Sequence, residues 1–183
     1  KKRITIPVFI PHSGCPHCCV FCNQWRVTGV SGKITPESLH KTIEKYLSAV
    51  PVTVEKIEIA FFGGSFTAIP DCEQVEYLSA VSPYIDNGVI DSVRISTRPD
   101  YIDKKKLDVL KKNHVETVEL GVQSFSTDVL AASGRGHTAE HVIDAVSLLK
   151  EYGFRTGIQL MPGLPADTAE RSIQSAEKTV ELR

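Results

Sequence analysis

Apolar, β-branched stretches alternate with segments of helical periodicity along almost the whole chain. Strands of this buried type, each followed by a helix, require a parallel sheet because every crossover must cover one face of the sheet. We expect strands at 4–10, 56–62, 92–96, 117–121 and 155–161, and helices at 35–47, 72–81, 102–112, 138–152 and 168–182. Right-handed crossovers then give either a doubly wound sheet or part of a (β/α) barrel.

Chemically distinctive residues follow each of the five predicted strands directly. Both architectures place their functional sites at the carboxyl ends of the strands. The segments at these ends are Cys15–Cys22, Gly63–Ser65, Ser96–Arg98, Gln123–Ser124 and Met161–Pro165. We therefore expect the five segments to form one site.

Four of the five cysteines fall within eight residues, and only Cys72 stands apart. A secreted disulfide framework spreads its cysteines along the chain, so this crowding indicates metal or redox chemistry instead. Two registers compete. Tandem CxxC pairs, Cys15/Cys18 and Cys19/Cys22, would suggest structural zinc, whereas CxxxCxxC uses Cys15, Cys19 and Cys22 and leaves Cys18 spare.

The second register is favoured. Structural zinc takes four ligands in a closed tetrahedron, and the adjacent Cys18 and Cys19 would strain two opposed pairs on one ion. Three thiolates can instead hold three irons of a cubane and leave the fourth iron open. We predict a [4Fe–4S] cluster on Cys15, Cys19 and Cys22, ahead of zinc and of a thiol redox centre. We also expect the cluster to order the segment from about Ser13 to Gly32.

The cysteine segment resembles the radical S-adenosylmethionine (SAM) superfamily, whose signature CxxxCxΦC has an aromatic residue where Phe21 stands. Phe61–Thr67 resembles its second motif, a Gly-Gly pair after strand two. Later segments resemble the branch of oxygen-independent coproporphyrinogen III oxidase and the Elongator catalytic subunit: Leu120–Phe125, Gly134–His137 and Leu160–Pro165. The resemblance spans residues 5–166 and implies a partial (β/α) TIM-type barrel with parallel strands.

The resemblance also implies reductive cleavage of SAM to a 5′-deoxyadenosyl radical, which abstracts hydrogen from an unidentified substrate. Gly63 and Gly64 would allow close backbone approach, and their carbonyls together with Ser65 would accept from the SAM ammonium. Arg135 would pair with the SAM carboxylate through its guanidinium fork. The other residues expected at the SAM site are Phe21, Ser96, Gln123, Gln159 and Met161.

Ordinary structural roles compete with several of these assignments. Gln123 and Gln159, expected at the ribose hydroxyls, could instead satisfy loop backbone, and Met161, expected near adenine, could pack in the core. The spacing from Cys15 to the next ligand sides with the porphyrinogen oxidase, because the Elongator branch spaces its first two cysteines more widely. The oxidase family carries an acidic residue where Ser96 stands and an Asp where Gln159 stands.

Composition points to a soluble globular domain, with 42% hydrophobic and 23% charged residues. No apolar run approaches the roughly 20 residues that span a bilayer, and no secretory segment follows the basic start, so we expect a cytoplasmic protein without membrane contact. The net charge of −1 gives no argument for a nucleic-acid partner. The basic residues at 104–106 and 111–112 are interpreted as a solvated helix face.

Residues 1–183 are expected to form one radical SAM core domain. The last predicted helix ends at the terminus, where the repeat predicts a sixth strand, so we expect the barrel to be truncated after its fifth βα unit. The expected partners are SAM, an electron donor such as flavodoxin or ferredoxin, and a porphyrinogen-like or tRNA substrate. The alternative is a zinc- or haem-binding module without turnover, built on the same fold.

Overall fold

A computed structural model describes residues 2–10, 15–22 and 34–182. Within these ranges the strands form one parallel sheet in the order β1-β2-β3-β4-β5. Their bounds are β1 Arg3–Ile10, β2 Lys56–Gly63, β3 Ser92–Thr97, β4 Val115–Gln123 and β5 Arg155–Leu160. A doubly wound sheet would reverse its strand order at a switch point. The unbroken order here confirms the partial barrel.

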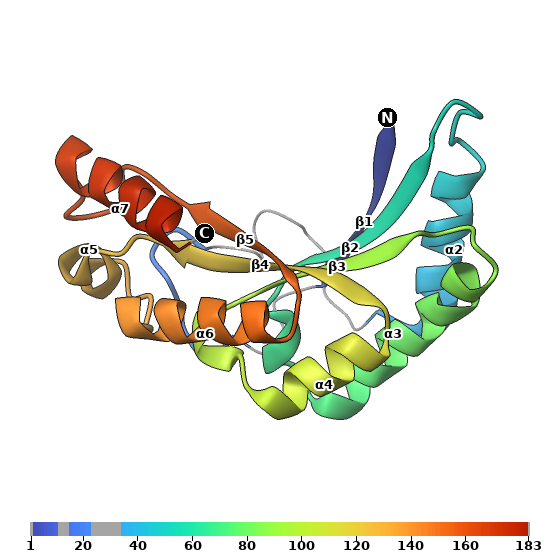
Figure 1. Cartoon of the computed structure of the whole chain (residues 1–183), viewed down its shortest axis with the longest axis horizontal. Coiled ribbons are helices and arrows are strands. Elements are labelled where there is room, and N and C mark those ends of the chain that lie inside the picture. Colours follow the sequence, from blue (N-terminus) through green and yellow to red (C-terminus); the bar gives the residue numbers. More distant parts are fainter. Residues whose placement is uncertain (1, 11–14, 23–33, 183) are drawn as a thin grey trace.

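The helices follow the outer side of the curved sheet (Figure 1). They are α2 Pro36–Leu47, α3 Asp71–Asp86, α4 Lys104–Lys112, α5 Thr127–Ala132, α6 Ala139–Glu151 and α7 Ala169–Glu181, with short 3₁₀ turns η1 Phe66–Ala68 and η2 Pro99–Tyr101. In the described part of the chain, no helix combines the length and apolarity needed to cross a membrane.

Side chains alternate along each strand between the face of the sheet that the helices cover and the opposite, inner face. Ile6, Val8 and Ile10 of β1 are at most 4% exposed and belong to the core under the helices. The side chains between them lie on the opposite, inner face, because successive strand residues point to opposite sides of a sheet. This inner face carries the residues that line the site.

Two predicted helix starts are confirmed. The Thr35 hydroxyl accepts from the Ser38 amide at 3.2 Å, the Ser38 hydroxyl accepts from the Thr35 amide at 3.0 Å, and Pro36 occupies the first turn. Such reciprocal caps satisfy amides that have no partner within the helix. At α7, Thr168 accepts from the Arg171 amide at 3.2 Å and is the cap, rather than Asp167.

Two helices differ from the sequence expectation. The helix predicted to end at Val81 continues for more than a turn, through Pro83. Proline costs a helix one hydrogen bond, but Tyr84 and Ile85 pack against the core and hold this last turn. Helix α5, with only six residues, was not predicted because it is too short to show helical periodicity.

Candidate functional site

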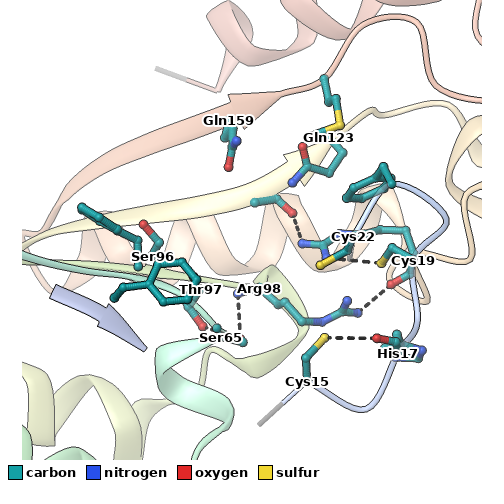
Figure 2. A pocket seen from close by; sticks show the side chains of 18 residues that line it. Cys15, His17, Cys19, Cys22, Ser65, Ser96, Thr97, Arg98, Gln123 and Gln159 are labelled. Carbon is teal, nitrogen blue, oxygen red and sulfur yellow. Dashed lines mark hydrogen bonds between the residues drawn. The ribbon is translucent and has the colours of Figure 1, made fainter. Parts of the chain in front are cut away.

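A cavity of about 400 Å³ opens at the carboxyl ends of the strands (Figure 2). Its volume falls within the roughly 300–1,000 Å³ of small-molecule sites. The cavity is lined by every residue predicted to bind the cluster or SAM: Cys15, Cys19, Phe21, Cys22, Gly63, Gly64, Ser65, Ser96, Gln123, Arg135, Gln159 and Met161. The structure therefore brings the five predicted strand-end segments together.

The cysteines differ in exposure. Cys19 is buried, Cys15 and Cys22 are half-buried, and Cys18 is exposed and does not line the cavity. In the described residues, no three side chains of histidine, cysteine, aspartate or glutamate are close enough to hold a metal ion. The three lining thiols thus share a wall of the cavity without forming a closed metal site. This donor set fits an iron–sulfur cluster better than structural zinc, which would need Cys18 as fourth ligand.

The turn between α5 and α6 holds the cysteine segment in place. The Val20 amide donates to the Ser133 carbonyl at 3.1 Å, and the Cys19 thiol donates to the Gly134 carbonyl at 3.7 Å. Gly136 has φ +81°, and the His17 ring occupies the space that a Cβ there would need. These contacts place Cys15–Cys22, whereas the remainder of the predicted 13–32 loop lies outside the described residues.

Gly63 ends β2 in a conformation that only glycine adopts readily. Its φ is +104°, and a Cβ would lie 2.5 Å from the Phe9 ring and 2.7 Å from the Ile10 carbonyl oxygen. The Gly64 amide donates to the same carbonyl at 2.9 Å. Gly63 and Gly64 thus line the cavity without side chains, as the sequence predicted.

Buried hydroxyls fasten the glycine turn to the end of β3. The Ser65 hydroxyl lies 2.9 Å from the Thr97 hydroxyl and accepts from the Arg98 amide at 3.2 Å. The Thr67 hydroxyl lies 2.5 Å from that of Thr97. Ser65 is therefore a structural tie between two strand ends, in addition to lining the cavity.

Gln123 has two unusual features for a glutamine at a strand end. Its φ is +71°, in a region that residues other than glycine seldom adopt. Its Oε1 is buried without a hydrogen-bond partner among the described residues. Buried polar atoms are nearly always paired, so this acceptor favours a bound ligand over the alternative of satisfying loop backbone. Its carbonyl accepts from the Met161 amide at 2.9 Å, which places Met161 beside it.

Ser96 donates to the Glu119 carboxylate at 3.2 Å. A carboxylate from β4 therefore lies beside position 96, where the resembling family carries an acidic residue. Ser96, Glu119 and the exposed Gln159 also line a second cavity of about 430 Å³ on the inner face.

Arg135 lies against a cysteine that we predict to be a cluster ligand. Its Nη1 donates to the Cys19 sulfur at 3.7 Å, and its Nη2 donates to the Gly121 carbonyl. Its Nε is buried without a partner among the described residues. The predicted pairing with the SAM carboxylate remains a prediction, for which Nε is the available donor.

Sequence reasoning gave no role to two other buried groups at this site. Arg98 is only 2% exposed and forms a bidentate pair with Asp100. His137 is 4% exposed, and its burial, reinforced by the charges of Arg135 and Arg98, lowers its pKa to about 3. His137 is therefore neutral at physiological pH. The sequence did contain a signal for the pair of Arg98 and Asp100, since these two residues flank a proline directly after a strand.

A chain of alternating charges crosses the inner face below the cavity. Glu58, which is fully buried, pairs with Arg3 at 3.0 Å and with Arg94 at 2.7 Å. Arg94 pairs in turn with Glu119 at 2.5 Å. Ion pairs thus link β1, β2, β3 and β4, which are also joined by backbone hydrogen bonds.

Glu58→Ala is expected to lower the free energy of unfolding by about 1–3 kcal/mol, because Arg3 loses its carboxylate partner and Arg94 keeps only Glu119. Urea denaturation of the apo protein measures the change. The control is Glu37→Ala, which breaks an exposed pair with Lys41 and should cost at most about 0.5 kcal/mol. Equal effects of the two substitutions would contradict this account of the buried network.

A family model described as the radical SAM superfamily matches residues 9–177. Heme chaperone HemW of Lactococcus lactis is 29% identical over 171 residues, which cover 92% of this chain and 44% of that protein. A tRNA uridine(34) acetyltransferase of Methanocaldococcus infernus is 28% identical over 206 residues, 90% of this chain and 38% of that protein.

Among solved structures, the archaeal Elp3 of Methanocaldococcus infernus matches with a TM-score of 0.70 and 25% identity. The match covers 96% of this chain and 42% of that structure. The chain therefore spans less than half the length of these relatives.

Proposed function

The chain belongs to the radical SAM superfamily, whose cofactors are a [4Fe–4S] cluster and SAM, and we propose that its main cavity binds both for the cleavage of SAM. The observation that carries the proposal is that three cysteines and the nine other predicted ligand-binding residues line one cavity. When bound, the reduced cluster supplies the electron that splits the S–C5′ bond of SAM into methionine and a 5′-deoxyadenosyl radical, which takes hydrogen from the substrate.

The cysteines act as the anchor for three irons and leave one iron without a protein ligand. Cys19 is the most buried of the three and is held by the turn before α6. Cys15 and Cys22 lie closer to solvent. Cys15, Cys19 and Cys22 would hold the cluster, with Cys19 the ligand best shielded from water.

Three groups of this chain are suited to orient SAM. The backbone at Gly63 and Gly64 lines the cavity without side chains and is suited to accept from the SAM amino group, while the Ser65 hydroxyl is tied to β3. The unpaired Oε1 of Gln123 is an acceptor for a ribose hydroxyl, and the unpaired Nε of Arg135 is a donor for the carboxylate. Gln123 and Arg135 are each only 7% exposed, so their unpaired atoms face little competition from water.

The proposed substrate is a porphyrinogen-like compound or a tRNA, and the proposed electron donor is a flavodoxin or ferredoxin. The relative named tRNA uridine(34) acetyltransferase supports the tRNA side of this choice, whereas the relative named heme chaperone supports the haem-binding alternative. Incubation with each substrate class under turnover conditions decides between them, since only a true substrate will incorporate or lose hydrogen.

The test is anaerobic reconstitution with iron and sulfide, followed by incubation with SAM and dithionite. We expect 5′-deoxyadenosine and methionine in equal amounts by mass spectrometry, formed only when both SAM and reductant are present. A reconstituted protein that holds iron, yet forms no 5′-deoxyadenosine, would contradict the proposed function. Haem binding without SAM cleavage would support the non-catalytic alternative instead.

A further inference from the structure

Arg98 is a buried cation fixed by three hydrogen bonds. Its Nε and Nη2 donate to the two carboxylate oxygens of Asp100 at 2.9 and 2.8 Å. Its Nη2 also donates to the Arg135 carbonyl at 2.8 Å. Arg135 belongs to the same turn whose Gly134 carbonyl accepts from Cys19. Arg98 thus connects the end of β3 to the support of the cysteine segment.

The guanidinium of Arg98 extends toward the predicted cluster ligands. Figure 2 shows it between Cys15 on one side and Cys19 and Cys22 on the other. Its Nη1 is buried and has no hydrogen-bond partner among the described residues. Burial alone would lower the pKa of Arg98, but the hydrogen bond and charge of Asp100, then the charges of Cys15 and Cys19, raise it. The cation is therefore electrostatically close to the thiolates.

We propose that Arg98 is a positioning residue that raises the reduction potential of the cluster on Cys15, Cys19 and Cys22 through its buried charge and its unpaired Nη1. The inference rests on the proposed function, because it presupposes the cluster. Reduction adds one electron from an external reductant and takes the cluster core from the 2+ to the 1+ state. A fixed positive charge stabilises the reduced form, and hydrogen bonds to the sulfurs act in the same direction.

Asp100 determines how much of that charge reaches the cluster. It takes two of the hydrogen bonds of Arg98, and its negative charge offsets the guanidinium. Removing Arg98 and removing Asp100 should therefore shift the potential in opposite directions. A purely structural role, in which either substitution only loosens the turn, predicts no such opposition of sign.

The experiment is an anaerobic redox titration of the reconstituted protein, followed by the EPR signal of the reduced cluster. For Arg98→Gln we expect on the order of tenfold less reduced cluster at a given potential, equivalent to about 59 mV for one electron. Arg98→Lys keeps the charge and should stay within about threefold of the unmodified protein, whereas Asp100→Asn should favour reduction by about threefold. Arg171→Gln, which breaks an ion pair outside the cavity, is the control and should leave the potential unchanged.

An unchanged potential in Arg98→Gln would overturn the inference, as would equal downward shifts in Arg98→Gln and Asp100→Asn. If Arg98→Gln fails to assemble the cluster, Asp100→Asn decides alone, and the absence of an upward shift overturns the inference. Failure of the proposed function is recognised separately, because in that case the unmodified protein itself takes up no redox-active cluster.

Discussion

Single alanine substitutions of Cys15, Cys19 and Cys22 are expected to reduce 5′-deoxyadenosine formation to the level of a protein-free control. Each thiolate holds one iron of the cubane, so the loss of any one opens a second iron and destabilises the cluster. Iron content after reconstitution should fall together with activity. The measurement pairs elemental analysis of iron with mass spectrometry of the nucleoside product.

Cys18→Ala is the matched control, since Cys18 adjoins Cys19 in sequence but is exposed and does not line the cavity. We expect its iron content and product formation to equal those of the unmodified protein. If Cys18→Ala lost metal as severely as the other three variants, four cysteines would be ligands. The three-cysteine register would then be wrong, and the tandem CxxC register would be correct.

Gly63→Ala is expected to abolish SAM binding and to lower the free energy of unfolding by about 2–5 kcal/mol. The substitution forces alanine into a φ of +104° and drives its Cβ against the Phe9 ring and the Ile10 carbonyl. Relief of this contact moves the glycine turn, and the backbone that we assign to the SAM amino group moves with it. Equilibrium dialysis with labelled SAM measures binding, and urea denaturation of the apo protein measures stability.

Gly88→Ala is the matched control, because it measures the cost in stability of a positive φ without a steric clash of the new Cβ. Gly88 also has a positive φ, of +70°, but nothing lies within 4 Å of its ideal Cβ. Its substitution should cost about 1–2 kcal/mol and leave SAM binding intact. If Gly63→Ala behaved like Gly88→Ala in both measurements, close backbone approach at Gly63 would not be what the site requires.

The elements of the fold were predictable where local sequence decides them. The Thr35 cap depends on residues within three positions, and the strand ends coincide with glycine and polar residues that stop an apolar run. Prediction failed where distant contacts decide. The end of α3 depends on Tyr84 and Ile85 reaching the core, and no local pattern reveals that a helix will continue through Pro83.

The site followed the same division. Most of the predicted ligand-binding residues needed only the rule that parallel strands end at one edge of the sheet, Arg135 needed the family resemblance, and the cavity gathers all of them. The buried charges needed register, which the sequence does not contain. Glu58 meets Arg94 because β2 and β3 pair with Ala60 opposite Arg94. Likewise, the buried guanidinium of Arg98 donates to the Arg135 carbonyl, a contact between residues 37 positions apart.

The central claim is a three-cysteine cluster whose fourth iron is open to SAM, and EPR spectroscopy of the reduced, reconstituted protein tests it most directly. We predict a [4Fe–4S]⁺ signal whose g values change when SAM is added, because the amino and carboxylate groups of SAM then bind the open iron. A signal that SAM leaves unaltered would contradict the account. So would a protein that takes up one zinc per chain and shows no iron signal.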